Sequence, residues 1–422
     1  MKSNPSRRIA IVGAGQSGLP LALALQARGD EVTLLSNRSA AQIRAGRVMS
    51  SQCMFDAALQ IERDHQLDWW ARDCPPVQGI GLCVPSPDPA APAGTRLIDW
   101  AAPLHKPAQA VDQRLKMPAW MEAFEQRGGR LVLQEAGIAE LEELAASHEL
   151  LVLAAGKGEI VNQLFARDAE KSCYDAPQRA LALTYVQGMR PREPFSRVCF
   201  NLIPGVGEYF VFPALTLNGA CEIMVFEGIP GGPMDCWADV KTPQQHLGRS
   251  LEILQRYLPW EAERCRDVRL SDELGTLAGR FAPTVRRPVG RLPSGRLVLG
   301  MGDAVVVNDP ITGQGSNNAT KAFQVYFEAI CARGEHAFDA AWMQATFDQS
   351  WAYAKDVVRW TNMLLAPPPE HILQLLGAAG QCPSLASLIA NNFDHPPAFF
   401  PWWGDAQECQ RLVARHLQGQ AA

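Results

Sequence analysis

Six residues near the N-terminus form a glycine-rich loop of the kind that binds phosphate groups. Gly13, Gly15 and Gly18 have the spacing G-x-G-x-x-G, directly after a short apolar run and before a segment rich in Ala and Leu. In this spacing the first glycine permits a sharp turn, the second lets backbone approach a pyrophosphate, and the third lets helix and sheet pack closely. The helix N-terminus presents unpaired N–H groups to the phosphates. We therefore expect a dinucleotide bound by Gly13, Gly15, Gln16, Ser17 and Gly18.

The acidic residue that usually binds a ribose at the end of the second strand is missing. Leu35 is followed instead by Ser36, Asn37 and Arg38. If adenosine binds here, polar contacts from Ser36 and Arg38 replace the carboxylate; Arg38 could equally be a solvated surface residue.

A second candidate site lies almost 300 residues further along the chain, at Asp303 and the segment that follows it. A carboxylate at a strand end suits a sugar or ribityl hydroxyl. Gly313 and Gly315 would bring backbone N–H groups and a helix N-terminus against an electron-rich ring edge. An ordinary strand-to-helix connection has the same pattern. The N-terminal loop favours a cofactor site, because two such loops far apart imply one extended cofactor that spans the domain.

The segments around these loops have the pattern of an α/β fold. An Ala- and Leu-rich helix at 19–28 lies between two short apolar runs, which is one βαβ unit. Further apolar runs that end in small residues would join the same parallel sheet. Its strands are expected at 8–12, 31–35, 131–133, 150–154 and 296–300.

A second, mainly antiparallel sheet is predicted between about residues 179 and 226, where short apolar runs alternate with Gly, Pro and Asn turns. Helices are expected at 314–333 and 338–365, before a Pro-rich break. The prediction is a Rossmann-like α/β domain with an inserted β-sheet substrate domain and C-terminal helices. The boundaries are 1–80, 105–175 and 270–345 for the first domain, 81–104 and 176–269 for the insert, and 346–422 for the helices.

Composition argues against several other classes of protein. The formal net charge of −5 over 422 residues gives no basic surface for nucleic acid. Eleven cysteines without a Cys-x-x-Cys pair indicate free thiols, and the histidine spacing predicts no metal site. No apolar run approaches ~18 residues and the first eight residues are polar, so we expect no membrane contact and a cytoplasmic location. Oxidative chemistry would need an organic cofactor.

The two glycine loops together resemble those of the flavoprotein aromatic hydroxylases. In that family a Gly-Asp strand end and a Pro-x-x-Gly-x-Gly loop hold the flavin. The resemblance implies FAD as the cofactor and a Rossmann-like fold of the aromatic hydroxylase type. It implies that Asp303 binds the ribityl or pyrophosphate region. Along the isoalloxazine ring it places Pro310, Gly313, Gln314 and Gly315.

Two departures from the single-component hydroxylases point to a two-component system. The middle Asp-Gly motif that serves both FAD and NAD(P)H reads Ala155-Gly156 here, and the usual His after Gly-Asp-Ala is Val305. What remains is similar to the styrene and indole monooxygenases, which take reduced FAD from a separate NADH-dependent flavin reductase. The likeness covers almost the whole chain. Its motifs lie at 46–47, 110–115, 177–180, 309–317, 359–362 and 391–393.

This closer resemblance implies that Arg47, Arg114 and Asn317 lie near FAD, although either arginine could be a structural ion-pair partner. It also points to indole. The styrene type has Asn-x-Val-x-His after the arginine and the indole type has Ser-x-Gln-x-Met, and this chain reads Ser-Ser-Gln-Cys-Met at 50–54. Val77, Ile80 and Ala108 stand where styrene enzymes have Tyr, His and Ser. The predicted substrate pocket is Ser50, Gln52, Met54, Val77, Ile80, Ala108, Pro310 and Ile311.

In such a pocket the apolar side chains would enclose a flat ring, and Ser50 or Gln52 would accept the indole N–H. Routine core residues would give the same pattern. The resemblance implies that reduced FAD and O2 form a flavin 4a-hydroperoxide, which epoxidises the 2,3 double bond of indole on the way to indoxyl and indigo. Styrene-like alkenes and sulfides would be further substrates, and no protein nucleophile is needed.

Other functions stay open at this point. A styrene monooxygenase proper and a non-catalytic flavin-binding protein of the same fold are both compatible with the sequence. A flavin halogenase is not favoured, because the chain has no Trp-x-Trp-x-Ile-Pro segment. The sequence leaves the oligomeric state undecided, and a homodimer is compatible with it.

Overall fold

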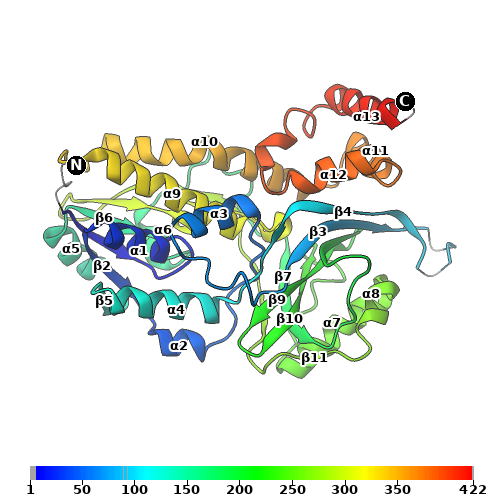
Figure 1. The fold of residues 1–422 in the computed structure, drawn as a ribbon, viewed down its shortest axis with the longest axis horizontal. Helices are drawn as coiled ribbons and strands as arrows, with labels where there is room; N and C mark the ends of the chain where they lie inside the picture. Colours follow the sequence, from blue (N-terminus) through cyan, green and yellow to red (C-terminus); the bar gives the residue numbers. More distant parts are fainter. Residues whose placement is uncertain (1–5, 89, 93, 421–422) are drawn as a thin grey trace.

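The computed structural model describes residues 6–88, 90–92 and 94–420. Most of the polar N-terminal segment considered above, residues 1–5, therefore lies outside the described residues. Two sheets lie next to each other, with helices α9 and α10 running along the first and the C-terminal helices covering the second (Figure 1). The predicted α/β fold class, with a second antiparallel sheet and C-terminal helices, is confirmed.

The first sheet has the strand order β14-β15-β6-β1-β2-β5 and is parallel except for the β14–β15 pair. Its central strand β1 is an apolar run because both faces are covered. Ile9 and Ile11 pack under α1, α4 and α9, whereas Ala10 and Val12 pack against α5 and α10. The strands are β1 (Arg8–Val12), β2 (Glu31–Ser36), β5 (Arg130–Leu133), β6 (Leu150–Leu153), β14 (Val289–Arg291) and β15 (Leu297–Gly300).

The second sheet has the order β11-β7-β10-β9-β8-β3-β4, with β12 also paired to β7. All its pairs are antiparallel except β3 with β8. Alternate residues therefore face opposite sides. Phe210 and Phe212 point toward the C-terminal helices, and Tyr209 and Val211 toward α7. The strands are β3 (Val77–Pro85), β4 (Arg96–Ala108), β7 (Ala180–Gln187), β8 (Arg197–Ile203), β9 (Gly207–Thr216), β10 (Gly219–Gly228), β11 (Arg269–Leu270) and β12 (Thr276–Gly279).

The strand limits differ from the predicted segments at three points. β3 begins before residue 81 and β4 ends after residue 104, because both strands continue pairing down to the Val77–Ala108 contact. β12 lies in the second sheet, although residues 270–345 were assigned to the first domain, because it pairs with β7 along its whole length. A short two-stranded sheet of β13 (Thr284–Val285) and β16 (Val306–Val307) follows.

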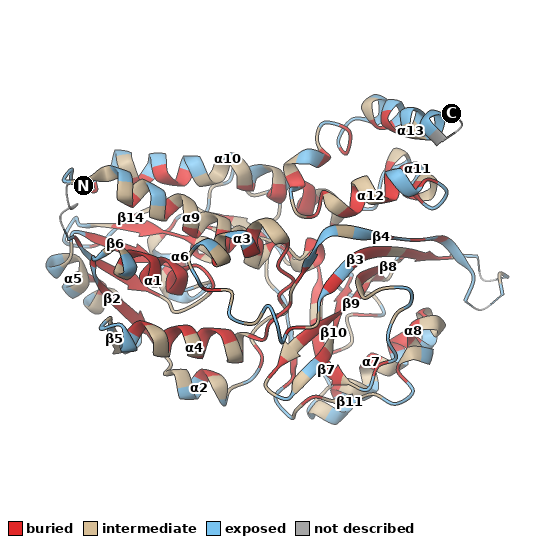
Figure 2. Cartoon of the chain, in the orientation of Figure 1, coloured by how far each residue is buried: buried red, intermediate tan, exposed pale blue. Residues whose placement is uncertain are grey.

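Helices pack against both sheets. The central strands of both sheets are mostly buried, whereas the outer face of α13 is exposed (Figure 2). Among the described residues no single helix is long and apolar enough to span a membrane, but α11 and α12 together meet that test as a pair bent by 116°. The helices are α1 (Gly18–Arg28), α2 (Ala40–Arg44), α3 (Asp56–Asp64), α4 (Gln113–Gln126), α5 (Ile138–Ser147), α6 (Glu159–Leu164), α7 (Pro243–Tyr257), α8 (Pro259–Arg264), α9 (Gly315–Arg333), α10 (Ala340–Leu364), α11 (Glu370–Ala379), α12 (Pro383–Asn391) and α13 (Ala406–Gln420), with short 3-10 turns η1 (Gly302–Ala304), η2 (Pro310–Thr312) and η3 (Pro396–Phe399).

Candidate cofactor and substrate site

A cavity of about 1200 Å³ extends from the two glycine loops to the face of the second sheet. This volume exceeds the range of about 300–1,000 Å³ typical of small-molecule sites, so it has room for a long cofactor together with a small substrate. At one end the wall is glycine-rich backbone from both predicted loops. At the other end it consists of the apolar side chains Leu181, Leu183, Phe210, Phe212, Val225 and Leu277.

The N-terminal glycines divide into two roles. Gly13 has φ of +115°, and a Cβ atom there would lie 2.3 Å from the carbonyl oxygen of Ala154. A Cβ at Gly18 would lie 2.0 Å from the carbonyl oxygen of Gly13. Gly15 lines the cavity and has nothing within 4 Å of the corresponding position. The first and third glycines thus allow β1, α1 and β6 to pack, and the second leaves backbone open toward a ligand.

Gln16 and Ser17 line the cavity beside this loop. Gln16 Nε2 donates to Glu62 Oε1 at 2.7 Å and to Thr320 Oγ1 at 2.9 Å. Glu62 is buried and pairs with Lys116 Nζ at 2.6 Å. Burial raises the pKa of Glu62 and the Lys116 ammonium opposes that rise. The buried pair therefore holds Gln16 in one orientation at the cavity wall.

Ser36 and Arg38, the residues predicted to replace the missing ribose carboxylate, also line the cavity. The Ser36 hydroxyl donates to the Arg38 carbonyl at 2.7 Å and accepts from the Arg38 N–H at 3.2 Å. The guanidinium of Arg38 contacts Met49 Sδ at 2.7 Å. Arg38 is half-buried at the cavity rather than solvated, so it is available to a polar cofactor group.

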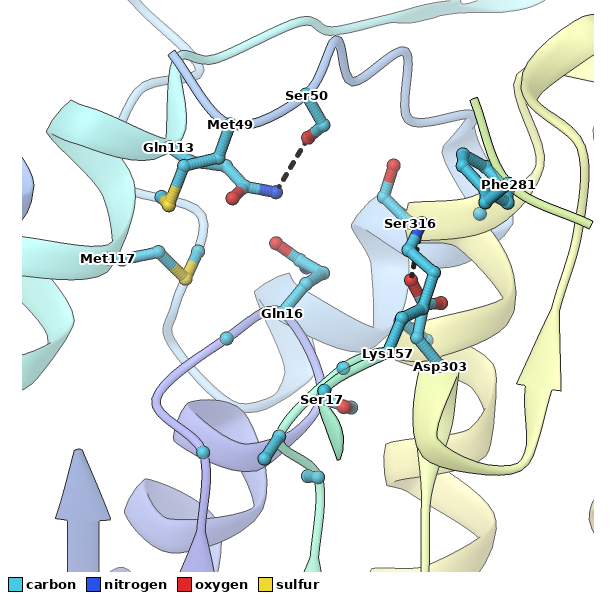
Figure 3. Close-up of a pocket in the computed structure, with 18 of the residues that line it drawn as sticks. Gln16, Ser17, Met49, Ser50, Gln113, Met117, Lys157, Phe281, Asp303 and Ser316 are labelled. Atoms are coloured by element: carbon cyan, nitrogen blue, oxygen red, sulfur yellow. Dashed lines mark hydrogen bonds and ion pairs between the residues drawn. The ribbon is translucent and has the colours of Figure 1, made fainter. Parts of the chain in front are cut away.

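Asp303 also lines the cavity and is joined there by Lys157, which the sequence prediction missed. Lys157 Nζ lies 3.8 Å from Asp303 Oδ2 and 3.5 Å from the centroid of the Phe281 ring (Figure 3). The surrounding protein raises the pKa of Asp303, and Lys157 and Arg286 oppose that rise. Lys157 follows β6 at the place of the missing Asp-Gly motif, so a cation beside that motif was the available signal.

The second loop reaches the cavity through Pro310, Gly313 and Gly315. Gly313 has φ of +66°, and a Cβ at Gly313 or Gly315 would meet nothing within 4 Å. Gln314 and Asn317 are buried and do not line the cavity. Instead they hold the loop in place.

Gln314 Nε2 donates to the carbonyl of Phe393 at 2.9 Å. Asn317 Nδ2 donates to the carbonyls of Cys53 at 2.9 Å and Gly313 at 3.0 Å, and its Oδ1 accepts from the N–H of Phe55 at 2.9 Å. Both amides thus fix the loop against neighbouring segments, and neither reaches the cofactor position directly.

The two arginines predicted near FAD do not line the cavity, and only Arg114 is an ion-pair partner among the described residues. Arg114 is 1% exposed and pairs with Asp112 Oδ2 at 2.7 Å and Asp272 Oδ2 at 2.9 Å. These two carboxylates occupy its guanidinium. Arg47 is exposed and donates to the carbonyl of Thr276 at 2.9 Å. Both arginines are structural links between the two halves of the molecule.

Of the residues predicted to contact substrate, Ser50 and Pro310 line the cavity. Ser50 Oγ accepts from Gln113 Nε2 at 2.9 Å, and its carbonyl accepts from the Tyr185 hydroxyl at 2.9 Å (Figure 3). Gln52 is buried, and its neighbours Ser51 and Cys53 line the cavity. Among the residues that the structure describes, neither the nitrogen nor the oxygen of its side-chain amide has a hydrogen-bond partner.

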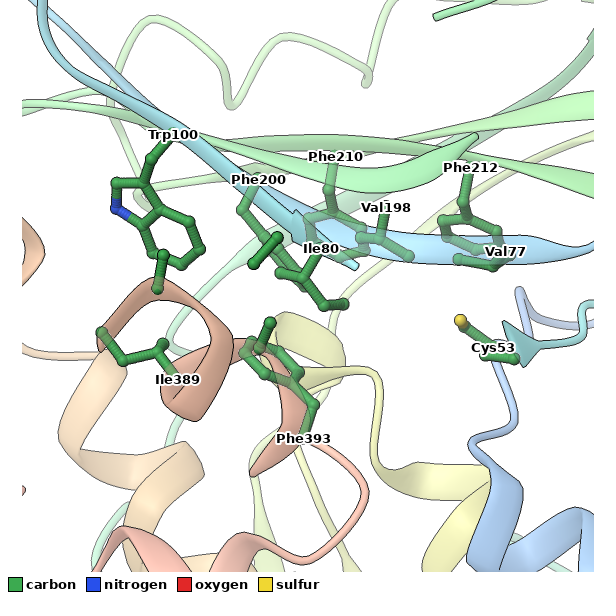
Figure 4. Close-up of a cluster of buried hydrophobic side chains, with 14 of the residues drawn as sticks. Cys53, Val77, Ile80, Trp100, Val198, Phe200, Phe210, Phe212, Ile389 and Phe393 are labelled. Carbon is green, nitrogen blue, oxygen red and sulfur yellow. The ribbon is translucent and has the colours of Figure 1, made fainter. Parts of the chain in front are cut away.

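Val77, Ile80 and Ala108 are buried together in the large apolar cluster that includes Phe210 and Phe212 (Figure 4). They lie among the residues that support the cavity wall and are not themselves on it. Ile311 is likewise buried away from it.

Met54, also predicted as a pocket residue, does not line the cavity. It pairs with Gln109 in an isolated antiparallel bridge, and its Sδ contacts Lys116 Nζ at 3.2 Å. It packs with Ala58 and Leu59 of α3 in a separate cluster. The apolar lining residues of β7, β9, β10 and β12 were missed instead; the uninterrupted apolar run at 209–215 of β9, typical of a strand buried on both faces, was the signal that could have found them.

The described residues contain no group of three His, Cys, Asp or Glu side chains that could hold a metal ion. All eleven cysteines are described and all are free.

Comparison with known proteins also points to a flavin-dependent monooxygenase. The family model described as "Styrene monooxygenase A putative substrate binding domain" matches residues 156–264. Styrene monooxygenase StyA of Pseudomonas fluorescens is 29% identical over 400 residues, which cover 92% of this chain and 93% of the relative. Styrene monooxygenase StyA of a Pseudomonas species matches at the same identity and coverage. These matches support the styrene monooxygenase oxygenase family.

Solved structures agree on the fold. The flavin-dependent brominase Bmp2 superposes with a TM-score of 0.69 at 14% identity, covering 98% of this chain and 100% of that one. A flavoprotein/dehydrogenase from Cytophaga hutchinsonii gives a TM-score of 0.67 at 12% identity, covering 99% and 100%. FAD is the cofactor that the fold and the relatives indicate. The open glycines at 15, 313 and 315, with Arg38, Lys157 and Asp303 around them, fit it.

A substitution pair tests which glycine serves the cofactor. Gly15→Val should leave the melting temperature nearly unchanged, because the added side chain enters the open cavity. It should weaken FAD binding by about tenfold or more, the equivalent of roughly 1.4 kcal/mol. Gly13→Ala should instead lower the free energy of unfolding by about 1–3 kcal/mol, because it strains the left-handed turn and meets Ala154. Thermal melts and flavin-fluorescence titration measure both; equal FAD affinity of Gly15→Val and wild type would contradict the assignment.

The Arg114 network gives a second prediction. Arg114→Met leaves Asp112 and Asp272 without their cation and should lower the free energy of unfolding by about 3–5 kcal/mol in urea denaturation. Arg47→Met, which removes an exposed arginine, should change it by no more than about 0.5 kcal/mol. A stable Arg114→Met variant that no longer binds FAD would restore the cofactor role of this residue.

Proposed function

We propose that this protein is the oxygenase component of a two-component flavin monooxygenase and that it epoxidises the 2,3 double bond of indole. The observation that carries the proposal is the cavity itself. It joins glycine loops suited to FAD with an apolar wall suited to a flat aromatic ring. The relatives named styrene monooxygenase support the same class of reaction.

The reduced cofactor comes, in this proposal, from a separate NADH-dependent flavin reductase. The motif that serves NAD(P)H in single-component hydroxylases is replaced here by Ala155, Gly156 and Lys157. FAD would therefore enter the cavity already reduced and leave it oxidised. The Lys157, Asp303 and Phe281 contacts at the wall are side-chain interactions that such an exchange can break and re-form.

FAD, when bound and reduced, supplies the activation of O2. The chain has two tasks. Leu183, Phe210 and Phe212 would exclude water from the reacting end of the cavity, and they would hold the substrate ring against the bound cofactor. No side chain has to act as a nucleophile.

Indole is favoured over styrene by one polar observation. An amide that is buried without a partner is rare in folded proteins and costly, and Gln52 is such an amide. A small adjustment of the 50–54 segment would let its Oε1 accept the indole N–H. Styrene has no such donor. Because the relatives carry the styrene name, styrene monooxygenase is the second candidate function.

The first test is direct. The purified chain, supplied with FAD, NADH, a flavin reductase and indole in air, should form a blue pigment, and mass spectrometry should detect oxygenated indole. Omitting the chain should remove both signals. Oxygen uptake unaffected by indole, with no oxygenated product from indole or styrene, would refute the enzyme assignment and leave a non-catalytic flavin-binding protein.

Gln52 should discriminate between the two substrates. Gln52→Leu should lower kcat/KM for indole by roughly tenfold, the value of one hydrogen bond of about 1–1.5 kcal/mol, because Leu offers no acceptor. It should leave kcat/KM for styrene unchanged or higher. Ser50→Ala is the matched comparison, since the Ser50 hydroxyl already accepts from Gln113. An equal loss on both substrates would show that Gln52 supports the fold and not the choice of indole.

A further inference from the structure

Two carboxyl groups are buried together behind the second glycine loop. Asp309 immediately precedes the cavity-lining Pro310 and is 1% exposed. Glu227, near the end of β10, is 0% exposed. The two side chains lie within hydrogen-bonding reach of each other, Glu227 on β10 and Asp309 in the segment between β16 and η2. The site described so far uses neither of them.

The surrounding charges do not neutralise this pair. Arg179 is the nearby guanidinium, but it makes a two-fold ion pair with Glu208, at 2.7 Å and 2.9 Å. Its remaining donor contacts the carbonyls of Gln178 and Leu365. In the ion pairs that the structure describes, neither Glu227 nor Asp309 has a cationic partner. Three carboxyl groups therefore share one arginine.

The other titratable groups around the pair do not change this balance. Glu208 lies directly across from Glu227 in the β9–β10 register and adds negative charge. Lys157 is on the cavity side and acts on Asp309 only from a distance. Tyr174 donates its hydroxyl to the carbonyl of Asn362 at 3.1 Å and is neutral. None of these groups supplies enough positive charge to keep both Glu227 and Asp309 ionised.

The hydrogen-bond geometry shows how the conflict is resolved. Asp309 Oδ1 accepts from the N–H of Ile311 at 3.1 Å and so caps the η2 turn. Asp309 Oδ2 and both oxygens of Glu227 receive no hydrogen bond from any donor group in the described part of the chain. A hydrogen bond between two carboxyl groups requires a proton on one of them. Burial raises the pKa of Glu227 well above its ordinary value, and the negative charge of Asp309 raises it further.

We propose that Glu227 is a positioning residue for FAD: as a neutral acid it donates a hydrogen bond to Asp309 and thereby fixes residues 308–313 against the cavity. Asn308, Pro310 and Gly313 of this segment line the cavity, so the position of the flavin-binding wall depends on the proton. The inference rests on the proposed function, because it concerns the binding of FAD at that wall.

The sign of the pH effect follows from the raised pKa of Glu227. The contribution of the pair is fully present below the ordinary glutamate pKa and is lost as pH rises through the raised pKa. Ionisation of both groups would force two carboxylates apart and displace the loop. FAD affinity should therefore fall with rising pH, by up to about tenfold per pH unit, the slope for one proton taken up with the ligand.

Three variants separate hydrogen-bond donation from bulk. Glu227→Gln keeps a donor for Asp309 but cannot ionise, and Glu227→Ala removes the donor. Glu222→Gln is the control on the same strand, because burial raises the pKa of Glu222 to about 7 but its charged neighbours are Arg264, Arg192 and Glu261. Infrared spectra of the proteins without FAD report protonated carboxylic acids by their carbonyl stretch. Fluorescence titration with oxidised FAD between about pH 6 and 9 measures the FAD affinity, which depends on the position of the flavin-binding wall.

At neutral pH, wild type should show a protonated-acid signal of Glu227 that Glu227→Gln lacks. Glu222→Gln should keep that signal and lose only the separate contribution of Glu222, whose pKa is raised to about 7. Glu227→Gln should bind FAD as wild type does at low pH and lose less affinity at high pH, whereas Glu227→Ala should bind about tenfold more weakly. An infrared signal unchanged by Glu227→Gln would overturn the proposal, as would equal FAD affinity of the Gln and Ala variants. A wild-type protein that binds no FAD at any pH would instead refute the proposed function, and the infrared result would still decide the state of Glu227.

Discussion

The close approach of the Gly13 turn to the end of β6 is the constraint on which the rest of the site depends. The turn passes so near the Ala154 carbonyl that only a glycine fits, and Gly18 lies equally close to the carbonyl of Gly13. These contacts set the start of α1 beside β1 and point its N-terminus into the cavity. Because residues 154–158 directly follow β6, the same packing also brings Lys157 to the cavity wall.

The substrate end of the cavity depends on a different constraint: successive side chains of a β-strand point to opposite faces of the sheet. On β9, Phe210 and Phe212 face the cavity and the C-terminal helices, while Tyr209 and Val211 face α7. Covering both faces lets the sheet carry large apolar side chains without exposing them to water. Val77, Ile80 and Ala108 extend this apolar layer at the β3–β4 end of the sheet. They can shape the cavity through the residues in front of them, which is a weaker influence than direct contact.

The sequence was informative wherever structure is decided locally. The glycine loops, the β1–α1–β2 unit, and β5, β6, β15 and β7 to β10 follow from apolar runs and turn residues over a few positions, and they are close to where they were predicted. The strands β3, β4, β11, β12 and β14 were not predicted. Side-chain direction is decided by distant partners. The bridge between Met54 and Gln109 turns Met54 toward Lys116, and Asp112 and Asp272 draw Arg114 into a buried pair. No sequence pattern links Glu227 and Asp309, because they are far apart in the chain and become neighbours only in the folded structure.

The placement of buried charge explains how one fold can combine a polar cofactor end with a dry substrate end. Ionised groups are paired behind the walls: Lys116 with Glu62, Arg114 with Asp112 and Asp272, and Arg179 with Glu208. A buried pair that loses one partner is strongly destabilising, so these groups hold the walls in one arrangement. They are also satisfied before any ligand arrives, and so they present no charge to the apolar end. The charged side chains that do line the cavity, such as Arg38, Lys157 and Asp303, lie among the glycine loops, where a cofactor with phosphates and a ribityl chain has the groups to meet them.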